Sequence, residues 1–130
     1  MDYQWQGILT LTKNGIQYKG KAIKVGSRYK YYDENDGQPV TNRFAQIEPN
    51  VWAYFGADGY AVTGEQVING QHLYFDQTGK QVKGATAANP DGSISYYDVH
   101  TGEKAINRWV KIPSGQWVYF NAQGKGYVSN

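Results

Sequence analysis

The stretch His72–Gly84, with the sequence HLYFDQTGKQVKG, contains the clearest indication of the fold of this 130-residue chain. It begins with an aromatic pair, Tyr74-Phe75, in a segment of the kind that favours a half-buried strand. The turn sequence Asp76–Gly79 follows, in which glycine can adopt the positive φ that reverses a chain. Lys80–Lys83 then alternates polar and apolar residues. The stretch therefore predicts a β-hairpin, with the segments on either side of the turn as its two short strands.

The same arrangement recurs along the chain. Five aromatic pairs follow one another at nearly equal spacings of about 22 residues, within the range typical of repeat proteins, and a glycine follows each pair four or five residues later. The pairs are Tyr31-Tyr32, Tyr54-Phe55, Tyr74-Phe75, Tyr96-Tyr97 and Tyr119-Phe120. A lone hairpin is marginally stable in water, whereas stacked hairpins bury their aromatic faces against one another. We therefore predict an all-β fold, a β-solenoid-like array of about six stacked short hairpins, without helices because no segment keeps an apolar period of about 3.6 residues.

The sequence also repeats at a second spacing, which is longer than the spacing of the hairpins. Asn42-Arg43-Phe44 returns as Asn107-Arg108-Trp109, and Trp52 returns as Trp117, both at the same spacing. Self-similarity of this kind indicates that a larger unit has been duplicated. The pattern predicts one repeat domain, residues 1–130, that consists of two modules, at about 1–65 and about 66–130.

Two pairs of polar residues follow only the longer period. Gln17 and Lys19 return as Gln81 and Lys83, whereas the other hairpins carry unrelated residues at the same offset from the turn glycine. Because a pair needed for folding would be present in every hairpin, we interpret these four residues as parts of binding sites. The structural alternative is that they are solvated strand residues, since Lys and Gln are mostly exposed.

The chemistry of these side chains suits a carbohydrate. Gln offers a carbonyl acceptor and two N–H donors, and Lys adds three donors, which together match the hydroxyl groups of a sugar. A tyrosine ring can pack on the C–H face of a pyranose at little cost in side-chain entropy. This ring has to come from a neighbouring hairpin; Tyr60 is the first choice, and Tyr74 and Tyr96 are the alternatives.

Other functions find less support in the residues. A solenoid can also be a structural or protein-contact module, which would leave the Gln and Lys pairs without a role. A glycosidase needs a pair of carboxylates, but the acidic residues lie mostly in or beside repeated turns, so we expect no catalytic residue. The 13 Lys and Arg against 11 Asp and Glu are too balanced and too dispersed for a nucleic-acid partner. There is no cysteine for a thiolate metal site, no metal or cofactor is expected, and no apolar run approaches the ~20 residues of a membrane span.

The succession of aromatic pair, turn glycine and Gln-x-Lys-Gly, as in LYFDQTGKQVKG, closely resembles the glucan-binding repeats of glucansucrases from lactic acid bacteria. These repeats are also called YG or cell-wall-binding repeats, and the region is often called domain V. The resemblance extends from about Gln6 to Asn130. Its aromatic–glycine part is shared with choline-binding and clostridial toxin repeats, whereas the Gln-x-Lys pair points to the glucansucrase type.

The resemblance implies non-catalytic binding of α-glucan, especially dextran and isomaltooligosaccharides, in pockets built from an aromatic ring, a Gln and a Lys. The aromatic ring for the pocket at Gln17 would lie before residue 1. A choline- or cell-wall-binding module is the alternative, and choline would need an aromatic cage for its quaternary ammonium. Carried over by position, the pocket residues are Tyr60, Thr63, Gln81 and Lys83 for one site, and Gln17 and Lys19 for the other.

The resemblance also implies a setting for the chain. Met1 is followed at once by repeat-like sequence and no signal peptide, which indicates a fragment of a longer protein. We expect the parent protein to be a secreted glucansucrase, a dextransucrase in particular, located outside the cell or at its surface. Truncated solenoids lack capping repeats, so self-association through the repeat ends is also expected.

Overall fold

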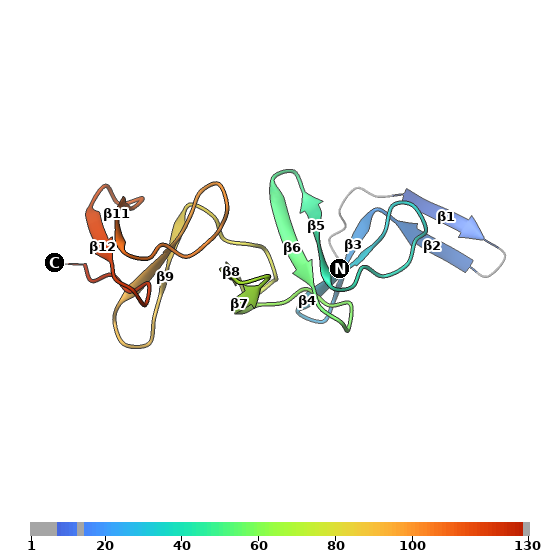
Figure 1. Ribbon diagram of the computed structural model, residues 1–130. Helices are drawn as coiled ribbons and strands as arrows, with labels where there is room; N and C mark the ends of the chain where they lie inside the picture. The colour runs from blue at the N-terminus through green and yellow to red at the C-terminus, as the bar shows by residue number, and fades with distance from the viewer. Residues whose placement is uncertain (1–7, 13–14, 129–130) are drawn as a thin grey trace. The chain divides into compact units, whose positions relative to one another are not determined.

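The computed structural model describes residues 8–12 and 15–128, and every regular element in these residues is a β-strand (Figure 1). The strands pair in chain order into two-stranded sheets, six of them in the part of the chain described. The predicted all-β array of about six hairpins is therefore confirmed. The strands are β1 (Ile8–Thr12), β2 (Gly15–Lys19), β3 (Lys21–Val25), β4 (Arg28–Tyr32), β5 (Arg43–Glu48), β6 (Val51–Phe55), β7 (Gly64–Ile68), β8 (Gln71–Phe75), β9 (Ala85–Ala88), β10 (Ile94–Tyr97), β11 (Arg108–Lys111) and β12 (Trp117–Phe120).

The strand pairing differs from the one expected across the glycine turn. β8 pairs with β7, the strand before it, through the turn Asn69-Gly70. Both turn residues have positive φ, 53° and 80°, as a two-residue type I′ hairpin turn requires. The turn at Asp76–Gly79 does form, with the N–H of Gly79 donating to the carbonyl of Asp76 at 3.0 Å. In place of the strand expected at Lys80–Lys83, however, there is a single bridge between Phe75 and Gln81.

The segment after a glycine turn bonds to its own hairpin and, at four of the turns, also to the hairpin before it. At these four turns, the N–H two residues after the turn glycine donates to a carbonyl of the preceding hairpin, two residues before its aromatic pair. After Gly37 the same position is Pro39, which has no N–H to donate. Hydrogen bonds of this kind are therefore the regular link between stacked hairpins. Among the described residues they are Ala61 to Tyr29 at 2.8 Å, Gln81 to Trp52 at 2.8 Å, Lys104 to His72 at 2.9 Å and Gly126 to Ile94 at 2.8 Å.

A residue with left-handed backbone conformation marks each junction between hairpins. It lies five residues after a turn glycine and either opens the next strand or immediately precedes it. Only Gly, or a short polar residue such as Asn, adopts this conformation routinely. The junction residues and their φ angles are Gly20 (61°), Asn42 (53°), Gly64 (76°), Gly84 (67°) and Asn107 (52°).

The chain divides into two compact units, each with its own core. The first unit ends at Gly64 and also takes Phe75–Gln81, and the second takes Glu65–Tyr74 and continues from Val82. Each core contains two buried aromatic residues, Tyr29 and Phe55 in the first and Tyr96 and Phe120 in the second. The first core contains Ala22, Tyr29, Val40, Ala45, Ile47, Ala53, Phe55 and Ala61. The second contains Tyr96, Ala105, Val110, Ile112, Val118 and Phe120.

Candidate functional site

Gln81 lies beside an exposed tryptophan in the first unit. Its backbone N–H donates to the carbonyl of Trp52 at 2.8 Å. At the equivalent pair in the second unit, Gly126 and Ile94, both backbone bonds form at 2.8 Å, so that the two residues are directly opposite. Gln81 and Trp52 are neighbours along the backbone in a similar way, and Gln81 also bridges Phe75 of its own hairpin.

This bond places a residue with an amide side chain next to a residue with an aromatic one. Gln81 is half-buried, and Trp52 is 37% exposed. Sequence reasoning did not single out Trp52 as a site residue, although it identified the repeat to Trp117. No local signal identifies Trp52, because its place beside Gln81 results from a bond between two hairpins.

Tyr60, the ring that the resemblance assigns to the sugar, already contacts two cations. The guanidinium carbon of Arg28 lies 4.7 Å from the ring centroid, and the Nζ of Lys30 lies 5.0 Å from it. Tyr60 and Lys30 are bridge partners, which places their side chains together. Arg28 is also 3.9 Å from a carboxylate oxygen of Asp58. A sugar stacking on Tyr60 therefore has to use ring surface that these cations leave open.

The other predicted site residues are placed as follows. Thr63 is half-buried in the first unit, and Lys83 is exposed in the second. Lys19 is half-buried at the end of β2. Gln17 pairs with Thr10 along the backbone of β1 and β2, and its side chain lies outside the described residues. Their roles in binding remain predictions.

The two alternative stacking residues are occupied by neighbouring rings in the second unit. Tyr74 stacks on Tyr97, with ring centroids 5.4 Å apart and planes 27° apart. Burial raises the pKa of Tyr97 to about 12. Tyr96 is buried and packs 6.3 Å from Phe120. Both alternatives are therefore already in contact with a neighbouring ring.

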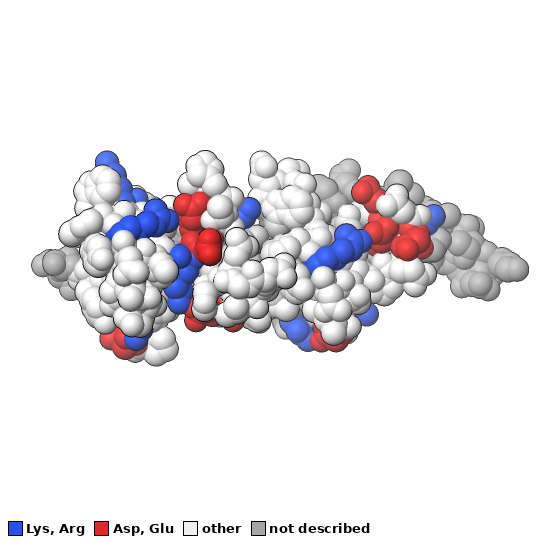
Figure 2. Space-filling model, in the orientation of Figure 1, with Lys and Arg blue, Asp and Glu red and all other residues white. Residues whose placement is uncertain are grey.

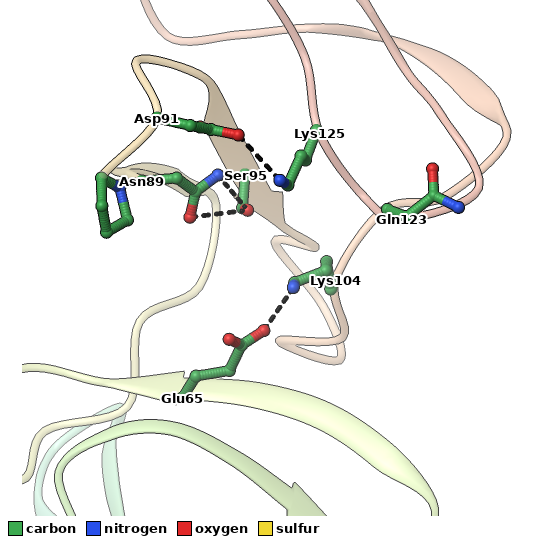
Figure 3. Close-up of a pocket in the computed structure, with 8 residues that line it drawn as sticks. Glu65, Asn89, Asp91, Ser95, Lys104, Gln123 and Lys125 are labelled. Carbon is green, nitrogen blue, oxygen red and sulfur yellow. Dashed lines mark hydrogen bonds and ion pairs between the residues drawn. The ribbon is translucent and has the colours of Figure 1, made fainter.

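A polar pocket of about 330 Å³ opens in the second unit (Figure 3). Two ion pairs face it, one between Lys104 and Glu65 and the other between Lys125 and Asp91, with Nζ and Oδ2 of the latter pair 2.7 Å apart. The turn sequence Asn89-Pro90-Asp91-Gly92 is typical of a plain loop, and sequence reasoning assigned it no further role. The pocket is lined by Glu65, Asn89, Pro90, Asp91, Ser95, Lys104, Gln123 and Lys125.

Hydrogen bonds hold this turn rigidly at the pocket. The amide nitrogen of Asn89 donates to the hydroxyl oxygens of Ser93 and Ser95, at 3.0 and 3.1 Å. The Oδ1 of Asp91 accepts from the backbone N–H and the hydroxyl of Ser93. Hydrogen bonds from Lys125 and Ser93 hold the pKa of Asp91 well below its usual range, so the carboxylate is ionised at neutral pH.

Charged side chains of opposite sign lie beside one another on the surface (Figure 2). One such pair recurs at the longer period: Arg43 bonds to Asp33 in the first unit, and Arg108 lies 3.5 Å from Asp98 in the second. Across residues 8–12 and 15–128, no cluster of three or more His, Asp or Glu could hold a metal ion. Nor is any helix there long and apolar enough to cross a membrane.

Comparisons with known proteins agree with this architecture. Glucosyltransferase-S of Streptococcus mutans serotype c is 42% identical to the chain over 118 residues, a match that covers 91% of this chain and 8% of the relative. Glucosyltransferase-I of Streptococcus downei is 44% identical over 113 residues, which covers 85% of this chain and 7% of the relative. The solved structure of truncated alternansucrase from Leuconostoc mesenteroides has the same fold, with a TM-score of 0.70 at 20% identity, over 88% of this chain and 10% of that one.

These matches confirm the resemblance to repeats of glucansucrases. They span a small part of the relatives, and the matching family is a binding repeat, which agrees with a module that carries no catalytic residues. The family model, described as a choline-binding repeat, matches residues 11–44 and 62–109. Because these residues are more than half of the sequence, the chain belongs to the choline-binding repeat family.

Proposed function

We propose that this chain is a non-catalytic carbohydrate-binding module that binds α-glucan, such as dextran or isomaltooligosaccharides. The observation that carries the proposal is the backbone hydrogen bond that joins Gln81 to the exposed Trp52. An indole ring packs on the apolar face of a glucosyl unit, while the amide donates to and accepts from its hydroxyl groups. Relatives that are glucosyltransferases, at 42 and 44% identity, support a glucose polymer as the ligand.

The binding residues are those that the sequence predicts, with one addition. We assign Gln81, Lys83, Tyr60 and Thr63 to one site and Gln17 and Lys19 to a second. Trp52 is added to the first site, because the ring of Tyr60 is already in contact with the cationic groups of Arg28 and Lys30.

Weak sites on one chain hold a polymer better than each site would alone. Once one site is occupied, the linked sites bind the same polymer at a high effective concentration. In a secreted parent glucansucrase, this would keep the glucan close to the enzyme that extends it. We therefore place the module outside the cell or at its surface, as part of a larger protein.

Affinity electrophoresis in gels that contain dextran tests the proposal. We expect the wild type to be retarded, and Gln81→Ala, Lys83→Ala and Trp52→Ala each to lose retardation. Gln77→Ala, an exposed glutamine in the turn after β8, is the matched control and should migrate like the wild type. Unchanged retardation in all three site variants would contradict the site assignment, and absence of retardation in the wild type would contradict the function.

Binding of choline is the second candidate, and one observation favours it. Trp109 and Tyr119 form an edge-to-face pair with centroids 5.6 Å apart, and the two side chains are 61% and 44% exposed. Aromatic faces open to solvent can receive a quaternary ammonium group through cation–π attraction. Titration with choline decides between the candidates: a choline-dependent change in tryptophan fluorescence without retardation by dextran would favour choline.

We also propose that the exposed face of β11–β12 mediates self-association. Trp109 corresponds to Phe44 at the longer period, and Phe44 lies 6.4 Å from Phe75 of the hairpin that follows it. The aromatic face of a hairpin in this fold is thus one on which another hairpin packs. A second copy of the chain offers hairpins of the same kind.

A further inference from the structure

The polar pocket of the second unit has the chemistry of a receptor for a neutral, hydroxyl-rich ligand. Lys104 and Lys125 supply ammonium donors, and Glu65 and Asp91 supply carboxylate acceptors, so the two ion pairs balance in charge (Figure 3). A charged ligand would have to compete with one member of each pair. A pair of adjacent hydroxyl groups, in contrast, can donate to a carboxylate and accept from an ammonium group while both ion pairs remain.

The pocket is also built in advance. Ser93 and Ser95 are each 1% exposed, and their hydroxyl groups fix the Asn89 side chain at the pocket wall. Asp91 has one oxygen bonded to Ser93 and the other to Lys125. Rigid polar groups lower the entropy cost of binding. The volume of about 330 Å³ lies at the lower end of the range of small-molecule sites, which suits a ligand the size of one or two sugar units.

Comparison of the two units shows that the fold does not require these residues. The bond from Gly126 to Ile94 in the second unit matches the bond from Ala61 to Tyr29 one longer period earlier, so the hairpins are equivalent. At the same spacing, Lys125 corresponds to Tyr60, Lys104 to Pro39 and Ser95 to Lys30. The tight turn between β3 and β4 also lacks the Asn and Asp that form the pocket wall. The same backbone thus carries an aromatic ring with cations in one unit and a polar pocket in the other.

We propose that this pocket is a separate saccharide site, which binds one pyranose unit through its hydroxyl edge and without a stacking ring. Lys104, Glu65 and Asp91 contact the sugar, and Asn89 and Lys125 hold the turn that presents Asp91. The proposal rests on the carbohydrate-binding function proposed above and adds a site to it. It also makes the second unit a contributor to polymer binding that is independent of Gln81.

Titration of the isotope-labelled chain with isomaltotriose, followed through its amide resonances, tests the site directly. We expect saturable shifts at the amides of residues 89–95, 104 and 125. Lys104→Met keeps the length of the side chain, whose methylene groups pack against Gly124, and removes the ammonium group. It should weaken the response at these amides about tenfold, because a hydrogen bond to a charged group is lost. Glu65→Gln changes an exposed residue and should also weaken the response of these amides to isomaltotriose. It tests the site if Lys104→Met does not fold.

The controls separate this proposal from the general function. Lys111→Met makes the same change at an exposed lysine of β11, and Gln81→Ala removes the other site; both should leave the pocket response unchanged. Shifts near Gln81 but none in the pocket would overturn the pocket and leave the α-glucan function intact. If isomaltotriose shifts no amide at all, the α-glucan function fails. A titration with N-acetylglucosamine then decides the pocket: saturable shifts confined to it support the proposal, and their absence overturns it.

Discussion

Gly79 shows how closely successive hairpins approach each other in this fold. Its φ is +101°, and a Cβ atom built on it would lie 2.6 Å from the Cβ of Ala61. Two requirements meet at this residue: a backbone conformation that L side chains rarely adopt, and contact with the preceding hairpin without any side chain. The sequence predicts the first requirement from the turn pattern, but the second depends on a neighbour in another hairpin.

Gly79→Ala should therefore destabilise the chain more than backbone strain alone would. Gly92→Ala is the matched control, because Gly92 has a similar φ of +91° and nothing within 4 Å of the added Cβ. We expect Gly79→Ala to lower the free energy of unfolding by about 1–3 kcal/mol more than Gly92→Ala, the usual cost of overpacking. Urea denaturation of both variants measures this difference, and equal losses would contradict the close packing.

The turn carboxylates make stability depend on pH. Hydrogen bonds from the backbone N–H groups of Thr101 and His100, with Arg108 nearby, lower the pKa of Asp98 in the folded chain. A lowered pKa means that the ionised carboxylate stabilises the fold above the pKa of the unfolded chain, about 3.9, and that this contribution is lost as the pH falls through the folded value.

Asp98→Asn should flatten this part of the pH dependence. The turn itself should survive, because Asn121 has the same place in the next hairpin and its Oδ1 accepts from the N–H groups of Gln123 and Lys125. Urea denaturation between neutral pH and pH 3 measures the effect. We expect the wild type to lose more stability than Asp98→Asn over this range, and an equal loss in both would show that Asp98 does not contribute.

At the scale of the hairpin, the sequence predicts the repeat correctly but not which segments pair. Aromatic pairs and turn glycines identify each unit because they are local signals. The segment Lys80–Lys83 alternates like a strand, yet Gln81 bonds to Trp52 of the preceding hairpin. Local alternation cannot show which partner a segment will choose, since the same pattern suits either neighbour. For the same reason the pairing of Gln81 with Trp52, and the pocket at Asn89 and Asp91, could not be predicted.

The left-handed junctions offer a test at this scale. Asn107 has a φ of 52°, and its N–H donates to the carbonyl of Asn121 at 3.2 Å. Asn107→Gly should be tolerated, because Gly holds this position in other hairpins. Asn107→Val keeps the N–H but should cost about 1–2 kcal/mol, since a β-branched residue is strained in this region. Thermal denaturation of the two variants compares them, and equal stability would contradict the assignment of the junction.

At the scale of the whole molecule, aromatic residues at equivalent places in two hairpins differ in how far they are exposed. Trp109 and Trp117 are 61% and 63% exposed, whereas the counterpart of Trp109, Phe44, is half-buried. Exposed apolar surface of this extent favours contact with other molecules. We expect the wild type to self-associate with rising concentration in sedimentation velocity experiments.

The double variant Trp109→Thr and Trp117→Thr should remain monomeric at the same concentrations. Threonine is favoured in strands, so the hairpin itself should be kept. Trp52→Thr is the control in the first unit, and it should sediment like the wild type. Association that persists in the double variant would place the contact on another surface.

The junction residues also bear on how such chains change in evolution. Successive hairpins are joined by residues of the same left-handed backbone geometry, so a gene rearrangement that cuts at two junctions adds or removes whole hairpins. The number of hairpins can then vary independently of their surfaces. A duplicated unit can keep its scaffold while its ligand-facing residues diverge, as Tyr60 and Lys125 have done at one position of the repeat.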